Sequence, residues 1–243
     1  MRLSPSTLNL FLECPKCFYL ELKMGIHRPK GPFPSLPGGM DGLIKKYFDK
    51  YRLLGQMPPE IDGRVEDARL FPDVEVLDKW RNWRTGLAFQ DEETGALLSG
   101  ALDDCLVKDG KYMPMDYKTR GYDVKEGGES FYQNQMDCYD LLLQKNGFKT
   151  AGYAWLIYWI PKEIKNQKSP PKADPPRAEK IKNTASLFDE KSDGAWVRFQ
   201  IDPKKIKTDA DSALKVFRDA VKLLEGPMPK AHSACTFCSW ASQ

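Results

Sequence analysis

Apolar residues along this chain recur with two periods, one typical of amphipathic helices and one typical of β-strands. Apolar positions three or four residues apart predict helices over residues 4–13, 41–51, 128–146 and 203–225. Alternating or continuous apolar runs predict strands within residues 96–119, 151–160 and 195–201. The Pro- and Gly-rich residues 28–39 and the Lys- and Pro-rich residues 161–177 are predicted to be loops.

Two of the predicted helices begin with residue types that favour a helix N-terminus. Ser4 can cap the first helix, and Pro5 fits its first position. Asp41 opens the second helix, where the helix dipole favours a carboxylate, so capping is one explanation for this residue. A short helix around residue 80 is expected to place Trp80 and Trp83 in the core rather than at a binding surface.

A β-hairpin is predicted around Asp109 and Gly110, because both residue types tolerate the positive φ angles of a two-residue type I′ turn. With that turn, Lys108 faces Lys111 across the hairpin. Pro114 is an anomaly, since a proline inside a strand favours an edge position, a bulge or a strand start. The register on the far side of Pro114 is therefore open to a shift.

The same register sets two carboxylates against each other. Counting back from the turn places Asp103 opposite Asp116, on the face that also carries Lys118, while Asp104 points to the other face. Opposed carboxylates destabilise a β-ladder unless a positive charge lies between them. A divalent cation takes hard-oxygen ligands of this kind. The hairpin is therefore predicted to carry a metal site with Lys118 beside it.

One predicted helix has a polar residue within its apolar stripe. Gln135 lies among four apolar positions: Phe131, Cys138, Tyr139 and Leu142. A buried amide left unpaired costs about 1–3 kcal/mol. We therefore expect Gln135 to be hydrogen-bonded to a functional group, although an ordinary amphipathic helix with one polar residue would show the same pattern.

Length and net charge exclude few classes of protein. At 243 residues the chain suits one domain with insertions or a small appendage. Its net charge of +3 does not by itself indicate nucleic-acid binding. No segment approaches the ~20 continuous apolar residues of a membrane helix. The N-terminal sequence lacks the hydrophobic region of a signal peptide, so we expect a cytoplasmic protein.

Cysteines are paired at the two ends of the chain. Cys14 and Cys17 near the start, and Cys235 and Cys238 near the end, form two Cys-x-x-Cys pairs, each spaced to bind one metal centre. Zn²⁺ and an iron–sulfur cluster both accept four cysteines, so spacing leaves the metal open. Such a centre would join the N-terminal helix to the C-terminal tail. The other two cysteines are expected to be buried in the core: Cys105 and Cys138.

Taken in order, these motifs resemble those of the PD-(D/E)XK nuclease superfamily, in particular its RecB-like branch, and are similar to the AddB nuclease domain and the CRISPR-adaptation exonucleases. The resemblance rests on Ser4-Pro5-Ser6 with Cys14-Pro15, Gly100-x-x-Asp103, Asp116-Tyr117-Lys118, Gln135-x-x-x-Tyr139 and the cysteine tail. It implies an α/β fold with a mixed central sheet flanked by helices. We expect a single domain over residues 1–243, with a core over about 38–226 and a metal-binding appendage formed by residues 1–25 and 227–243.

The resemblance also implies a function, a Mg²⁺- or Mn²⁺-dependent DNA nuclease that acts as an exonuclease on single-stranded or end-containing DNA. Asp103, Asp116 and the backbone carbonyl of Tyr117 correspond to metal ligands, and Lys118 to the residue that positions or deprotonates the attacking water. The residues that would orient the DNA strand are Gln135 and Tyr139. A histidine often stands in relatives where this chain has Asp41, so Asp41 is either a substituted metal ligand or a helix cap.

For the cysteines, the resemblance implies a 4Fe-4S cluster. Relatives usually supply one cysteine early and three late, whereas this chain supplies two and two, so Zn²⁺ remains an alternative. A helicase or a CRISPR-adaptation protein is an expected partner besides DNA. Two other functions stay open: a catalytically silent module that binds DNA or a partner, and cleavage of RNA.

Overall fold

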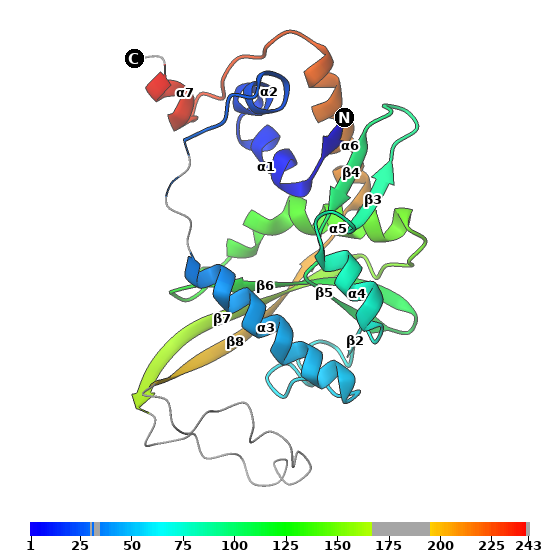
Figure 1. Ribbon diagram of the computed structural model, residues 1–243, viewed down its shortest axis with the longest axis vertical. Coiled ribbons are helices and arrows are strands. Elements are labelled where there is room, and N and C mark those ends of the chain that lie inside the picture. Colours follow the sequence, from blue (N-terminus) through cyan, green and yellow to red (C-terminus); the bar gives the residue numbers. More distant parts are fainter. Residues whose placement is uncertain (30, 32–34, 167–194, 242–243) are drawn as a thin grey trace.

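A five-stranded mixed sheet forms the centre of the protein in the computed structural model, which describes residues 1–29, 31, 35–166 and 195–241 (Figure 1). Its strand order is β2-β5-β6-β7-β8, and β6 and β7 are parallel while the other neighbours are antiparallel. The strands are β2 (Arg69–Leu70), β5 (Asp104–Lys108), β6 (Lys111–Thr119), β7 (Tyr153–Asn166) and β8 (Ala195–Lys207). The predicted α/β class with a mixed central sheet is confirmed.

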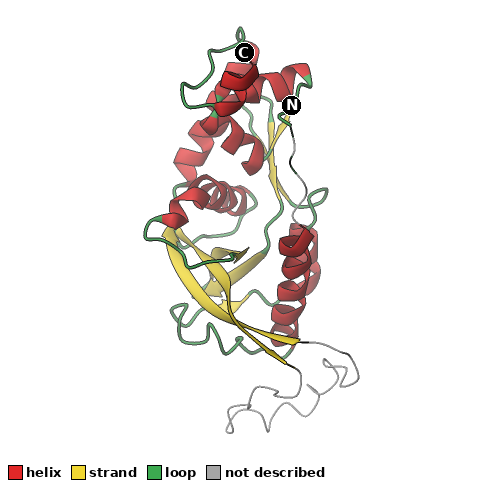
Figure 2. Cartoon of the chain, turned by 90° about the vertical axis from the view of Figure 1, so that its left-hand side faces the viewer, coloured by secondary structure: helices red, strands yellow, loops and turns green. Residues whose placement is uncertain are grey.

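Helices cover both faces of this sheet (Figure 2). On one face, α3 (Ser35–Leu53) packs Ile44 and Phe48 into a cluster with Met115 and Ile157. The other face carries a larger core beneath four helices: α1 (Pro5–Glu13), α2 (Pro15–Met24), α5 (Gln133–Lys145) and α6 (Ala210–Glu225). Three shorter helical segments complete the described chain: α4 (Val74–Arg81), the 3-10 helix η1 (Gly128–Tyr132) and α7 (Thr236–Ala241).

A second, three-stranded sheet lies beside the main one, with the order β1-β4-β3. Its strands are β1 (Arg2–Leu3), β3 (Leu87–Gln90) and β4 (Leu97–Gly100). The sequence assigned residues 96–100 to the start of the hairpin, which is wrong, because these residues pair with β1 and β3 instead. The chain changes sheet between Gly100 and Asp104, and Asp103 therefore lies just before the first hairpin strand.

The hairpin register predicted from the turn is confirmed. Asp109 and Gly110 have φ angles of 50° and 71°, as a type I′ turn requires, and pairing runs without a shift from Lys108–Lys111 to Asp104–Met115. Pro114 causes no bulge although β6 is a central strand. Its nitrogen lies on the β7 side, as that of Tyr112 does, and the ladder with β7 begins only at Met115. The missing N–H therefore falls outside the ladder.

Among the N-terminal helices, the predicted start of α3 is wrong and that of α1 is confirmed. Helix α3 begins at Ser35, so Asp41 lies in its second turn and cannot be an N-terminal cap. Pro37 is accommodated because the first-turn N–H groups of a helix have no partner within it. Helix α1 matches its prediction, with Ser4 as the cap and Pro5 at the first position.

Strands β7 and β8 are both longer than predicted. Residues 161–166 continue β7 past a bulge between Pro161 and Glu163, and the rest of the predicted loop, residues 167–177, lies outside the described residues. The helix expected from residue 203 begins instead at Ala210, because β8 continues to Lys207. Pro203 fits there because β8 is an edge strand, where a missing ladder donor is tolerated.

Candidate active site

Asp116 and Lys118 lie near the end of β6 and point to the face of the sheet that α5 covers. Lys118 Nζ forms an ion pair with the Asp116 carboxylate. The same ammonium donates to Gln135 Oε1 at 3.2 Å and lies 4.3 Å from the centre of the Tyr132 ring. Contacts on several sides therefore hold the lysine beside the carboxylate.

Gln135 links β6 to α5. Its Nε2 donates to Asp116 Oδ1 at 3.1 Å and to Tyr139 Oη at 2.9 Å, while its Oε1 accepts from Lys118. Residues 135 and 139 are four apart and share one side of the helix, so one helical turn places both beside Asp116. The polar residue in the apolar stripe thus has partners for both ends of its amide. Phe131, predicted to share that stripe, is 86% exposed because it lies in η1, before α5 begins.

Asp103 completes the pair of opposed carboxylates. The backbone N–H of Tyr117 donates to Asp103 Oδ2 at 3.4 Å, which holds this carboxylate beside β6. Burial, and then the charge of Asp103, raise the pKa of Asp116 to about 7, although Lys118 acts in the opposite direction. Two carboxylates in this position repel each other, and a cation between them would relieve the repulsion.

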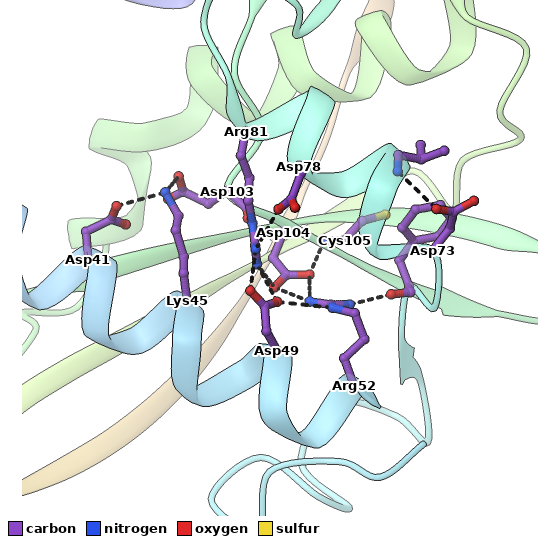
Figure 3. Close-up of polar contacts among 12 residues, drawn as sticks. Asp41, Lys45, Asp49, Arg52, Asp73, Asp78, Arg81, Asp103, Asp104 and Cys105 are labelled. Atoms are coloured by element: carbon purple, nitrogen blue, oxygen red, sulfur yellow. Dashed lines mark hydrogen bonds and ion pairs between the residues drawn. The ribbon is translucent and has the colours of Figure 1, made fainter. Parts of the chain in front are cut away.

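Lys45, which the sequence analysis did not single out, joins Asp41 to this group (Figure 3). Its Nζ lies 2.8 Å from Asp41 Oδ2 and 2.8 Å from Asp103 Oδ1. Burial alone would lower the pKa of Lys45, but Asp103 and Asp41 outweigh burial and raise it. Lys45 therefore stays charged and separates Asp41 from the other carboxylates. The i, i+4 spacing of Asp41 and Lys45 on one helix was the available sequence signal.

A buried ionic network lies on the opposite face of the hairpin and centres on Asp104 (Figure 3). Asp104 accepts from Arg52 Nη2 at 2.6 and 2.7 Å, from Arg81 Nη2 at 3.1 Å and from the Tyr117 hydroxyl at 2.6 Å. Arg81 also donates through Nε to the backbone carbonyl of Asp103 at 2.8 Å. The network thus ties α3, α4 and the hairpin together and fixes the backbone that carries Asp103.

Gly100 allows β4 to approach α5. A Cβ added at Gly100 would lie 3.0 Å from Leu142 Cδ1 and 3.1 Å from Tyr139 Cε1, so one of these side chains would have to shift. The glycine of the Gly100-x-x-Asp103 motif therefore brings the strand before Asp103 against the tyrosine that contacts Gln135. Within this motif, Gly100 lets the backbone of β4 approach α5, and Asp103 supplies a carboxylate of the site.

The residues present fit a divalent cation. Asp116 Oδ2 is buried and pairs with the Lys118 ammonium, and the Asp103 carboxylate lies beside Asp116. Carboxylate oxygens are the ligands that Mg²⁺ and Mn²⁺ prefer. Asp103 and Asp116 are placed to hold such an ion, and the backbone carbonyl of Tyr117 stays a predicted ligand. Asp41 contacts the group only through Lys45, so it would reach an ion only if Lys45 moved.

One residue that the sequence analysis assigned to the core lies beside this site. Trp80 is buried and stacks on Phe71 with ring centroids 4.9 Å apart, as expected. Trp83, however, is 67% exposed, because α4 ends at Arg81 and the indole no longer follows the buried face of the helix. The spacing of apolar residues could not reveal that Trp83 is exposed, because it does not show that α4 ends at Arg81.

The four terminal cysteines come together where α2 meets α7, two helices that lie at the same end of the molecule (Figure 1). Their sulfur atoms all lie within 4.8 Å of one another, and this group joins the start of α2 to α7. Although burial opposes it, hydrogen bonds from the backbone N–H groups of Cys17 and His232 lower the pKa of the Cys14 thiol to about 6. Arg28 Nη2 lies 3.6 Å from Cys235 Sγ. The predicted burial of Cys105 and Cys138 is confirmed.

Comparison with known proteins places this geometry in a family. A family model described as the PD-(D/E)XK nuclease superfamily matches residues 43–243. A search of curated proteins finds no match. None of the helices in the described part of the chain is long and apolar enough to cross a membrane. Since the matched residues make up most of the chain and include the hairpin, α5 and the cysteine tail, the chain belongs to the PD-(D/E)XK nuclease superfamily.

Proposed function

We propose that this protein is a metal-dependent nuclease that hydrolyses phosphodiester bonds in DNA. The observation that carries the proposal is the contact of Asp103, Asp116, Lys118 and Gln135 on one face of the sheet. Superfamily membership supports a hydrolase of this class. A buried carboxylate with a raised pKa, beside a second carboxylate and a lysine, is the kind of group that functional sites contain.

Each residue has a role that follows from its contacts. Asp103 and Asp116 would hold Mg²⁺ or Mn²⁺, which supplies Lewis-acid polarisation of the phosphate and a bound water of lowered pKa. Lys118 would orient the attacking water or, as the neutral amine, deprotonate it. As the ammonium, it would stabilise the negative charge that develops on the phosphate oxygens. Gln135 positions Lys118 and Asp116 relative to each other, because its amide contacts both. With Tyr139, it would orient the DNA strand.

Finer assignments follow from the resemblance in sequence motifs. We place the chain in the RecB-like branch, as a single domain acting as an exonuclease on single-stranded or end-containing DNA. A helicase or a CRISPR-adaptation protein is the expected partner. Three motifs follow one another along the sequence: Asp103, Asp116-Tyr117-Lys118 and Gln135-x-x-x-Tyr139. Their order, and the number of residues between the second and the third, resemble those of RecB-like nucleases and support this branch.

A catalytically silent binding module is the second candidate function. The four-cysteine centre favours the binding module, because a metal held by four cysteines can stabilise a fold without taking part in catalysis. Against it, Asp103 and Asp116 stay close enough that the charge of Asp103 raises the pKa of Asp116, an arrangement for which a module without chemistry has no use.

For the cysteines, we propose a bound metal that joins the termini. A tetrahedral Zn²⁺ with Zn–S bonds of about 2.3 Å spaces its sulfur atoms by about 3.8 Å. The Sγ–Sγ distances of 3.4, 3.6 and 3.9 Å therefore favour a single ion over the 4Fe-4S cluster that the resemblance implies, because four irons hold their thiolates farther apart. Metal analysis of anaerobically purified protein separates the two: about one zinc per chain, or about four irons with visible absorbance.

The nuclease proposal is tested by incubating linear single-stranded, linear duplex and circular single-stranded DNA, and RNA, with Mg²⁺ or Mn²⁺. We expect metal-dependent cleavage of linear DNA that Lys118→Ala abolishes, whereas Lys46→Ala, at an exposed lysine of α3, leaves it unchanged. Sparing of the circle would identify an exonuclease. Undiminished cleavage by Asp116→Ala would overturn the site assignment, and failure of metal-loaded, folded wild-type protein to cleave any strand would favour the binding module.

A further inference from the structure

A cavity of about 420 Å³ opens next to the proposed catalytic residues. Gln135 and Tyr139 form one wall, and β1, β4 and the start of α1 form the others. Gln135 Nε2 also contacts Asp116 Oδ1, so one side chain separates the cavity from the carboxylates. The volume falls in the range of small-molecule sites, about 300–1,000 Å³. A group bound here would directly adjoin a phosphate held at the carboxylates.

Trp83 lines this cavity and offers an aromatic surface. Its side chain is exposed, yet the segment that carries it is held in place. Arg2 Nη2 donates to the Trp83 backbone carbonyl at 2.9 Å, and Arg84 places its guanidinium 4.8 Å from the centre of the indole ring. A Cβ at Gly86 would lie 2.4 Å from the Gly100 carbonyl oxygen, so only glycine lets this segment pack so closely against β4. Trp83 is thus an exposed ring on a fixed backbone.

Arg2 and Tyr139 supply hydrogen-bond donors to the same cavity. Arg2 uses Nε for Ser99 Oγ at 2.7 Å and Nη2 for the Trp83 carbonyl, which leaves further donors of its guanidinium for a ligand. Tyr139 Oη accepts from Gln135, so its own proton can be donated to another acceptor. Burial, followed by the charges of Asp116 and Asp103, raises the pKa of Tyr139, and this proton is therefore retained at neutral pH. Cationic and hydroxyl donors beside an exposed indole match a nucleotide, which has phosphate acceptors and a planar base.

We propose that this cavity binds the nucleotide adjoining the scissile phosphate, with its base stacked on Trp83 and its outer phosphate at Arg2. The inference rests on the proposed nuclease function and specifies its substrate further. A base can stack on Trp83 only if it has left its own duplex, so the strand is unpaired at this nucleotide. Recognition through stacking and phosphate contacts is tolerant of sequence, because every base presents a π-face.

The test uses a single-stranded DNA with one abasic nucleotide, cleaved by wild-type protein and resolved bond by bond. We expect the bond adjoining the abasic nucleotide to be cut about tenfold more slowly than the other bonds, since stacking of one base has that weight. Trp83→Ala is expected to cut all bonds of this strand at similar, reduced rates. Trp83→Phe keeps the discrimination, and Leu53→Ala, at an exposed position at the end of α3, behaves as wild type. Equal discrimination by wild type and Trp83→Ala would overturn the proposal.

A binding measurement keeps this inference separate from the nuclease proposal. Fluorescence anisotropy of a labelled single strand is measured with Ca²⁺ for Lys118→Ala and for the double variant Lys118→Ala, Trp83→Ala. A preference for a normal strand over a fully abasic strand that disappears with Trp83 supports the cavity assignment, even if no cleavage is found. The same preference in both variants shows that the indole does not bind a base, whether or not the protein is a nuclease.

Discussion

Asp103 and Asp104 are consecutive residues, and their carboxylates are hydrogen-bonded to two different groups of Tyr117. The Tyr117 N–H donates to Asp103 Oδ2 at 3.4 Å, and the Tyr117 hydroxyl donates to Asp104 Oδ2 at 2.6 Å. One face carries the proposed catalytic group, and the other carries the ionic network around Arg52 and Arg81. A single residue therefore connects the reactive side of the sheet to its structural side.

This arrangement predicts opposite effects for the same substitution at neighbouring positions. Asp104→Asn removes the buried charge that Arg52 and the partly buried Arg81 neutralise, and breaking such a pair costs about 3–5 kcal/mol of the free energy of unfolding. Asp103→Asn removes a charge at the edge of the site and is expected to abolish cleavage with little loss of stability. Denaturant unfolding and the cleavage assay, applied to both variants, measure the two effects. A stable, active Asp104→Asn protein would show that the network does not support the site.

Lys45 is predicted to compete with the proposed metal ion for Asp103. Its Nζ lies 2.8 Å from Asp103 Oδ1, an oxygen that a divalent cation would need. Removing one positive charge at such a distance should strengthen binding of Mn²⁺ to the free protein by about tenfold in Lys45→Met. Lys46→Met, at the neighbouring exposed position, is the matched control. Calorimetric titration with Mn²⁺ measures the change, and weaker binding in Lys45→Met would show that Lys45 stays beside the ion.

The ion pairs of Asp49 predict that the protein loses part of its free energy of unfolding in acid. Burial alone would raise the pKa of Asp49, but Arg81 and Arg52 outweigh burial and lower it. Because the folded state then binds fewer protons than the unfolded state, the stabilisation is present above the unfolded pKa of about 4 and is lost as the pH falls through the lower folded pKa. Asp49→Asn should be less stable by about 1–3 kcal/mol at neutral pH.

Urea unfolding of wild type and Asp49→Asn between pH 7 and pH 2.5 checks this sign. The difference in the free energy of unfolding is expected to stay constant down to about pH 5 and to shrink on further acidification. A difference that grows below pH 4 would mean that the Asp49 carboxyl is not held ionised by its arginines.

The cysteine centre predicts a loss of metal and of thermal stability together. Cys238→Ser removes one of four sulfur atoms that lie within 4.8 Å of one another, and the remaining three hold a metal less tightly. We expect the bound metal to be lost and the melting temperature to fall by several degrees, since the centre joins α2 to α7. Cys138→Ala serves as the control, because this thiol lies in the core and keeps the metal content unchanged. An unaltered metal content in Cys238→Ser would exclude the four-cysteine site.

Local patterns allowed much of the hairpin and its chemistry to be predicted. The Asp109-Gly110 turn determines the register, and with it the opposed positions of Asp103 and Asp116, because side chains alternate strictly along a strand. The helical repeat likewise places Gln135 and Tyr139, four residues apart, on the same side of α5. Each of these inferences needs only covalent geometry and a few neighbouring residues.

Element boundaries were harder to predict because tertiary packing overrides local preference. Gly38 and Gly39 disfavour a helix, yet α3 includes both. Asp202-Pro203 resembles a helix start, yet its partners in β7 extend β8 to Lys207. At Pro203, the ladder with β7 outweighs the local preference. Residues 35–39 of α3 are exposed, so burial does not account for the early start of this helix.

By itself, the sequence determined the turn, the strand register, the spacing of the proposed catalytic residues and the paired cysteines, since all of these depend on spacing along the chain. Only the tertiary structure decided that Lys45 stands between Asp41 and Asp103, that Arg52 and Arg81 neutralise Asp104, and that Trp83 borders the cavity beside Gln135. Those relationships join segments separated by tens of residues. Their physical cause is the packing of α3 and α4 against the sheet, which no local period encodes.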